Sequence, residues 1–180
     1  MRGCPFDSMS FNNEDVNLKK LMINPKEDLI FDLKVREMCK WCKRYGKKAT
    51  CFPYIESVEF YSNLLPKYNN GTIFYDFFLT SDKNKEQIGK ESSLMIHRKI
   101  ISERHRLFFE GHYLIIGFGA GSCKLCDKCS FPCRLPAKAL IPIEATGMDV
   151  VKVMKKFGVE VKFPVEKLTY ICRIGAIFYD

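Results

Sequence analysis

The stretch YLIIGFGAGSCKLCDKCSFPC, residues 113–133, joins an apolar run directly to a loop that is rich in cysteine. The apolar run, residues 113–119, is short and uninterrupted, which predicts a buried β-strand. The loop that follows places four thiols within eleven residues, at Cys123, Cys126, Cys129 and Cys133. Clustered thiols in a reducing compartment are typical of metal binding or redox chemistry. The sequence therefore predicts a strand that leads into a metal site.

On either side of this stretch, the hydrophobic pattern alternates between strands and helices. This alternation favours an α/β (α+β) fold, in which helices cover a mixed sheet of about four to five strands. The strands at 29–35 and 113–119 each lead into a cysteine group, so we expect both cysteine loops at one sheet edge. Further strands are predicted at 72–79, 159–163 and 168–179, and helices at 55–65, 85–111 and 148–158.

The chain length of 180 residues suits a single domain, residues 1–180. Apolar residues make up 47% of the chain, which is enough for a core, and no linker or repeat divides it. Residues 1–28 are expected to be a loosely packed N-terminal segment, because their start is polar and unpatterned. No segment reaches the roughly 18 apolar residues of a membrane span, and no signal peptide is recognised. We therefore expect a cytoplasmic protein with no membrane partner.

Nine cysteines are many for this length, and their odd number excludes complete pairing within one chain. Cytoplasmic thiols stay reduced, so these cysteines are expected to be metal ligands rather than disulfides. The second group, C-x2-C-x2-C-x3-C, has the spacing of bacterial ferredoxins, which bind cubane clusters. We expect one or two 4Fe–4S clusters. Their predicted ligands, and hence the cofactor-binding residues, are Cys39, Cys42, Cys51, Cys123, Cys126, Cys129 and Cys133.

The spacing leaves two questions open. Zinc is the alternative metal, held in a tetrahedral set by Cys39, Cys42, Cys123 and Cys126. The partner of Cys133 is the second question. In two-cluster ferredoxins the last cysteine of such a run ligates the other cluster, and Pro132 stiffens the chain before Cys133. We therefore favour Cys133 as a ligand beside the first group, with closure of its own loop's site as the rival.

Four segments together resemble a family of small, cysteine-rich predicted metal-binding proteins of unknown function, found in anaerobic bacteria and archaea. The resemblance covers roughly residues 30–180 and implies a metal, iron–sulfur in kind, on the seven cysteines named above. It implies no activity. Thr146 stands where some members have cysteine, so an extra ligand there is absent. The segments are CKWCKRYGKKATCFP (39–53), FFEGHYLIIGFGAGSCKLCDKC (108–129), PCRLP (132–136) and IEATGMDV (143–150).

The net charge is +8, and residues 34–48 carry seven basic side chains against one acid, Glu37. Basic groups around the thiols would stabilise an anionic cluster. They would also suit the docking of an acidic redox partner such as a ferredoxin, and the plain alternative is a solvated basic face.

Three functions fit these observations, and the first is favoured. It is electron transfer by a cytoplasmic iron–sulfur protein. The second is an iron–sulfur enzyme whose three-cysteine cluster leaves one iron open for substrate or sulfur chemistry. The third, a zinc-stabilised nucleic-acid-binding module with Trp41 and Tyr45 as stacking residues, is the least favoured, so we do not expect a nucleic-acid partner. No catalytic residue is predicted: His97 and His105 are expected at the surface. Cys172 is expected as a small core residue and Cys4 in a loose N-terminus, with an eighth ligand as the alternative role of either.

Overall fold

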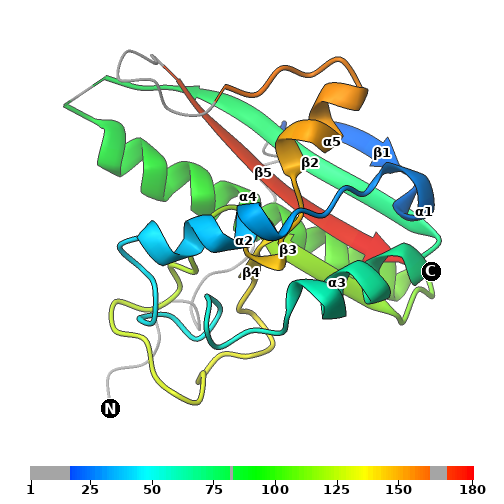
Figure 1. Cartoon of the computed structure of the whole chain (residues 1–180), viewed down its shortest axis with the longest axis horizontal. Coiled ribbons are helices and arrows are strands. Elements are labelled where there is room, and N and C mark those ends of the chain that lie inside the picture. The colour runs from blue at the N-terminus through cyan, green and yellow to red at the C-terminus, as the bar shows by residue number, and fades with distance from the viewer. Residues whose placement is uncertain (1–16, 82, 163–169) are drawn as a thin grey trace.

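The computed structural model describes residues 17–81, 83–162 and 170–180, and Cys4 lies outside them. Within the described residues, five strands form one mixed sheet in the order β1-β2-β5-β3-β4 (Figure 1). Neighbouring strands run antiparallel, except that β3 and β4 are parallel. This confirms the predicted mixed sheet. The strands are β1 Lys19–Ile23, β2 Asn70–Leu79, β3 Ile115–Gly119, β4 Ile141–Pro142 and β5 Tyr170–Tyr179.

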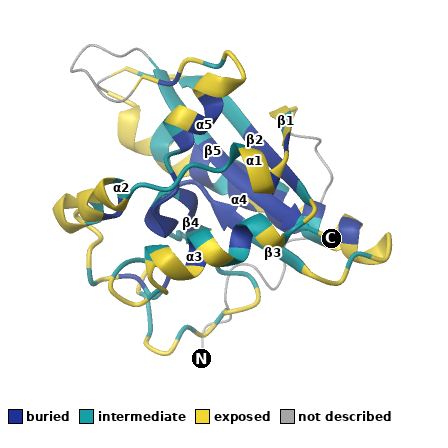
Figure 2. Ribbon diagram, turned by 45° about the vertical axis from the view of Figure 1, so that its right-hand side comes forward, coloured by how far each residue is buried: buried dark blue, intermediate teal, exposed yellow. Residues whose placement is uncertain are grey.

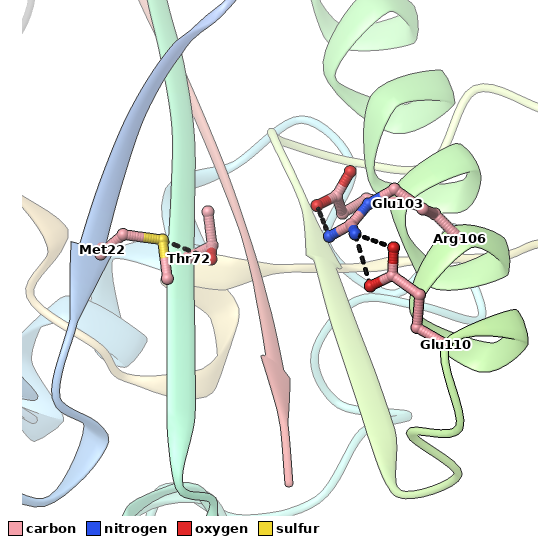
Figure 3. Close-up of polar contacts among 5 residues, drawn as sticks. All are labelled: Met22, Thr72, Glu103, Arg106 and Glu110. Carbon is pink, nitrogen blue, oxygen red and sulfur yellow. Dashed lines mark hydrogen bonds and ion pairs between the residues drawn. The ribbon is translucent and has the colours of Figure 1, made fainter.

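The two longest strands, β2 and β5, pair along their whole length, from Asn70 opposite Tyr179 to Leu79 opposite Tyr170. Both are rich in β-branched and aromatic residues, which suit a pleated and half-buried surface. β1 extends this pair on one side and β3 on the other. At the β1 edge of the sheet, where Met22 is paired with Thr72, the Thr72 hydroxyl lies 3.3 Å from the Met22 sulfur (Figure 3).

Helices cover both faces of the sheet. The described residues contain α1 Pro25–Asp28, α2 Leu33–Glu37, α3 Val58–Leu64, α4 Lys85–Phe109 and α5 Val150–Lys156, with 3₁₀ turns η1 Met38–Trp41, η2 Leu65–Lys67 and η3 Ile143–Thr146. None of these helices has the length and apolar character that a membrane crossing requires. The predicted helices at 55–65, 85–111 and 148–158 correspond to α3, α4 and α5.

Alternate residues of β5 face two different groups of buried side chains. Ile177 packs with α4 residues such as Ile96 and Ile100, whereas Ala176 and Phe178 face the other side, toward α3 and α5. Figure 2 shows the buried residues concentrated along the sheet and the inner sides of the helices. The period-2 alternation of the central strand thus places one apolar layer on each face of the sheet.

Helix α4 approaches the sheet closely because glycine occupies the contact. A Cβ atom at Gly175 would lie 2.4 Å from Ile96 Cγ2 and 2.9 Å from the Phe118 carbonyl oxygen. A Cβ at Gly117 would lie 2.6 Å from Ile100 Cγ2. Glycines on the two adjacent strands β3 and β5 therefore allow α4 to pack close to the sheet.

The last turn of α4 is fixed by charged side chains. Arg106 donates to Glu103 at 2.6 Å and also pairs with Glu110, so that one guanidinium links both carboxylates (Figure 3). Gly111 follows with φ of +96°, and the His112 N–H bonds to the Leu107 carbonyl. This left-handed glycine ends the helix, as the sequence predicts.

The predicted strand at 29–35 is wrong. Phe31 makes only an isolated bridge to Met148, and the chain then turns into α2. Asp32 explains the change, because its side chain accepts from the Lys34 N–H at 2.9 Å and caps the helix. The segment 29–35 has residues typical of a β-strand, but the helix cap at Asp32 in its middle starts α2 instead.

Two other expectations differ from the structure. Residues 159–162 form no strand, and position 163 lies outside the described residues. Within the N-terminal segment 1–28, residues 17–28 contain β1 and α1, with Leu18, Ile23 and Pro25 buried. The sequence shows little sign of this packing, because among the described strands β1 pairs with β2 alone. Four of its five residues are exposed or partly exposed, and only Ile23 is buried.

Candidate metal centre

Two loops carry the predicted ligands, and they lie side by side (Figure 1). The first cysteine loop, residues 38–57, connects α2 to α3, and the second cysteine loop, residues 120–140, connects β3 to β4. The Ala49 N–H donates to Cys129 Sγ at 3.3 Å, and the rings of Tyr54 and Phe131 are 4.5 Å apart between centroids. The two loops therefore form one continuous layer at this end of the molecule.

All four thiols of the second cysteine loop line one pocket. The first cysteine loop completes its wall with Lys48, Ala49 and Thr50. Burial raises the pKa of Cys123, while the N–H of Leu125 and the charge of Lys48 act in the opposite direction. The pocket also contains Leu125, Ser130, Arg134, Leu135 and Ala139 with Cys123, Cys126, Cys129 and Cys133.

Cys133 lines the pocket of its own loop, which is the position of the rival expectation. The centre that Cys133 ligates stays a prediction. The Arg134 guanidinium donates to the Lys128 carbonyl at 2.6 Å, and the Ser130 hydroxyl donates to the Pro132 carbonyl at 3.0 Å. These bonds turn the chain back after Cys129, so the stiffness of Pro132 does not carry the next thiol away.

The first group forms through a series of tight turns. The N–H of Cys42 bonds to the Cys39 carbonyl at 3.1 Å, and the N–H of Cys51 bonds to the Lys48 carbonyl at 3.0 Å. Burial raises the pKa of Cys51 to about 11, and the nearby thiols of Cys42 and Cys39 add to this increase. Cys39 is partly buried beside Glu144, whereas Cys42 is exposed. The three thiols thus lie within electrostatic reach of one another.

Arg36 anchors the first cysteine loop to the body of the protein. Its side chain is only 4% exposed, and Nη1 donates to the carbonyls of Ala145 at 2.7 Å and Glu56 at 2.9 Å. The guanidinium also lies 4.5 Å from the centre of the Phe52 ring. A buried arginine with backbone partners on both η3 and the loop holds the thiols of this loop in place.

Charged groups are buried around both thiol groups. Burial raises the pKa of the Glu144 carboxyl, although Arg173 and Lys124 lie close enough to oppose this. Burial lowers the pKa of Lys124 to about 8, and the cations Arg173 and Arg44 lower it further. Arg173 itself is held by α4, since it donates to Ser92 Oγ at 3.1 Å and to the Gly89 carbonyl at 3.0 Å.

Sequence reasoning placed Lys124 and Arg44 beside the thiols but missed Arg173. Arg173 comes from β5, far along the chain from either cysteine group, and no spacing signal connects it to them. His97 is buried and its Nε2 lies 2.7 Å from the Lys138 carbonyl, so the expectation of a surface residue is wrong. His97 lies against the second cysteine loop, where it lines a pocket with Ala120 and Leu140, and this loop covers it. His105 is exposed, as expected.

Thiolates are suitable metal ligands, but the thiols of the described residues are not arranged to coordinate a metal ion as they stand. The eight cysteines in the described residues are all free, and Cys172 packs half-buried against the core. Across residues 17–81, 83–162 and 170–180, no three or more His, Cys, Asp and Glu side chains are arranged so that they could hold a metal ion as they stand. The zinc set is divided, because Cys123 and Cys126 line the pocket while Cys39 and Cys42 do not.

Comparison with known proteins gives one match. The family model described as "Predicted metal-binding protein (DUF2284)" matches residues 22–179, which include both cysteine loops. No curated protein and no solved structure matches the chain.

Proposed function

This chain belongs to the DUF2284 family of predicted metal-binding proteins, and on that premise we propose that it is a cytoplasmic iron–sulfur protein that transfers electrons. The observation that carries the proposal is the grouping of four thiols around one pocket. Four cysteine thiolates are the usual ligand set of a 4Fe–4S cluster. A cytoplasmic location agrees with this role, because thiols stay reduced there.

The chain supplies what an anionic cluster needs. Cys123, Cys126, Cys129 and Cys133 would hold it, and the Ala49 N–H already points at one of their sulfurs. Hydrogen bonds to the sulfurs and nearby cations stabilise such a cluster and adjust its reduction potential. When bound, the cluster would supply the one-electron chemistry that no side chain of this protein provides.

Zinc accounts for fewer of these residues. A structural zinc ion takes four ligands in a closed tetrahedron, which leaves three of the seven thiols without a role. The four cysteines that such a site would combine are divided between the pocket and the first group. The grouping of the thiols therefore favours iron–sulfur.

The enzyme alternative has one observation in its favour. The first group offers only three thiols, Cys39, Cys42 and Cys51, and Cys42 is exposed. A three-cysteine cluster here would leave one iron open to substrate or sulfur chemistry at the surface. Electron transfer remains the preferred function, because the second group has a complete set of four thiols.

The first test is the composition of anaerobically purified protein. We expect about four or eight iron atoms per chain, matching sulfide, and broad visible absorbance that bleaches with dithionite. Changing Cys126 to Ser should remove the contribution of the second centre and leave any centre of the first group. A colourless wild-type protein that contains zinc and no iron would refute the proposal.

An acidic redox protein such as a ferredoxin is the proposed partner. Five basic side chains of residues 34–47 are exposed, and the single acid of this segment, Glu37, already pairs with Lys40. Trp41 is 91% exposed among them and adjoins Cys42. An apolar centre with a charged rim is typical of a protein interface, and opposite charge would steer an acidic partner to it. The basic residues are Lys34, Lys40, Lys43, Arg44 and Lys47.

Trp41 is the single tryptophan of the chain, so its fluorescence reports on this surface directly. Titration with a purified acidic ferredoxin should shift the emission to the blue and should weaken as salt is added. Calorimetry should show weaker binding for the Lys43→Glu variant than for the matched control Lys90→Glu on α4. Binding of single-stranded DNA but not of ferredoxin would instead favour the nucleic-acid alternative.

A further inference from the structure

We propose that Lys48, a lysine of the first cysteine loop, sets the reduction potential of the metal centre in the second cysteine loop. This inference rests on the proposed iron–sulfur function and adds a control element to it. It makes Lys48 a positioning residue, which acts on the centre through its charge and is not itself a ligand.

Lys48 is placed against the second group although it belongs to the first loop. It is only 9% exposed, whereas its neighbour Lys47 is exposed. Its Nζ lies 3.4 Å from the carbonyl oxygen of Cys126, and its side chain lines the pocket with all four thiols. A lysine is rarely buried to this extent, so a nearby compensating negative charge is expected.

The neighbouring backbone contributes in the same direction. The Ala49 N–H donates to Cys129 Sγ at 3.3 Å, so two successive residues of the first loop face the second group. Other cations nearby are placed differently. Lys124 donates to the Ser122 carbonyl at 3.2 Å and lines a separate pocket with His97, while Arg134 is exposed at the outer wall.

Electrostatics gives the sign of the effect. Reduction adds one negative charge to a thiolate-ligated cluster, and a buried cation stabilises the more negative state more strongly. Because the surroundings have a low dielectric constant, the interaction is much stronger than it would be in water. Lys48 should therefore raise the potential of the second centre, and its removal should lower it.

The arrangement also couples the two thiol groups. Lys48 and Ala49 lie between Cys42 and Cys51, and the Cys51 N–H bonds to the Lys48 carbonyl at 3.0 Å. Disturbing the first group therefore displaces the lysine that faces the second. A Cys39→Ser variant should lower the potential of the second centre, in the same direction as loss of the Lys48 charge.

The experiment compares three lysine variants with the wild type by anaerobic redox titration followed by EPR, and a Cys126→Ser variant assigns the signals. The signal that disappears in Cys126→Ser identifies the second centre. Lys48→Gln should lower its potential with iron per chain unchanged, Lys48→Arg should restore most of the potential, and Lys47→Gln should leave it as in the wild type. Lys47 is the matched control, because it has the same charge one residue away and is exposed.

Two results would overturn the inference while leaving the iron–sulfur proposal intact. One is an unchanged potential in an iron-replete Lys48→Gln protein. The other is an equal fall in Lys48→Gln and Lys47→Gln, which would indicate a general effect of surface charge. If Lys48→Gln does not retain iron, an Arg variant whose potential falls despite its kept charge overturns the inference instead. The iron content of the wild type is measured before any variant. A wild type without iron would refute the proposed function itself.

Discussion

Cys133 and Cys172 show how differently the same side chain can be placed. Cys133 lines one pocket with the three other cysteines of its loop, and the loop there is bridged by the bond from Arg134 to the Lys128 carbonyl. Cys172 lies in β5 against the core, and burial raises its pKa to about 11, which keeps it a neutral thiol at physiological pH. Spacing predicts which cysteines cluster, because it is local. It does not predict the position of Cys133, because the loop there is shaped by a hydrogen bond between two residues six positions apart, Arg134 and Lys128.

We expect Cys133→Ser to change the same centre as Cys123→Ser. The reason is that both thiols line one pocket. The measurement is the EPR spectrum of the reduced protein, with iron per chain determined on the same samples. Cys172→Ser is the control and should leave iron and spectrum unchanged. If Cys133→Ser altered the centre of Cys39 and Cys42 and spared the other, the placement of Cys133 would be wrong.

Glu103 carries a prediction on pH. Burial alone would raise its pKa, but the hydrogen bond and charge of Arg106 outweigh this and hold it below its ordinary value of 4.5. A carboxyl group with a lowered pKa stabilises the folded state above its ordinary pKa, and this contribution is lost as pH falls through the folded value. Glu103→Gln should therefore reduce the free energy of unfolding at pH 7 by at most about 1 kcal/mol.

The difference between wild type and Glu103→Gln should shrink as pH falls below 4.5, the ordinary value for this carboxyl. Urea unfolding at a series of pH values measures it. Glu110→Gln removes the other carboxylate partner of Arg106. The Glu110 side chain is half-exposed, so this change should reduce the free energy of unfolding less than Glu103→Gln does. A difference that stays constant with pH would show that packing, and not charge, accounts for the loss.

At the scale of elements, α4 lies unusually close to β5, because Gly175 of the strand has no Cβ to meet Ile96 of the helix. The sequence predicts both elements, because most apolar residues of the long helix recur at helical spacing and the strand has a run of β-branched and aromatic residues. It does not predict α2 within the expected strand at 29–35, since one cap at Asp32 decides that segment. Nor does it predict the closeness of α4 to the sheet, which depends on glycines from two separate strands.

Gly175→Ala should destabilise the protein by about 1–3 kcal/mol, the range for overpacking a core. The added Cβ would lie 2.9 Å from the Phe118 carbonyl oxygen, and backbone cannot move aside as a side chain can. Thermal or urea unfolding measures the change. The matched control is Gly89→Ala within α4. Its new Cβ would meet the end of the Arg173 side chain at 3.1 Å and lie in ordinary contact with Ile171 Cδ1 at 3.9 Å. That variant should not lose stability, because alanine favours helix.

The whole molecule consists of a packed sheet with its helices and a layer of two cysteine loops beside it. The apolar groups on the two faces of the sheet contain none of the seven predicted ligands among their members. Sequence predicts the sheet and the two groups of thiols. The contacts that join the loops, such as Ala49 with Cys129, connect residues 80 positions apart and have no local signal.

Removal of metal should therefore loosen the loops and leave the sheet folded. Hydrogen exchange on protein stripped by chelator under reducing conditions should show faster exchange in residues 38–57 and 120–140. The amides of β2 and β5 should keep their protection, because their pairing and packing do not use the thiols. Collapse of protection throughout the sheet would mean that metal binding supplies folding energy to the whole domain.

The position of β5 has a consequence for biosynthesis. This strand lies in the middle of the sheet, between β2 and β3, yet it follows both cysteine loops along the chain. A ribosome completes residues 39–51 and 123–133 before it makes residues 170–179. The sheet that supports the second loop lacks its central strand until then. During translation the thiols therefore belong to a nascent chain whose sheet is incomplete. A metal that needs the supported site would therefore enter after β5 is made, and the thiols would need a reducing environment most of all during synthesis.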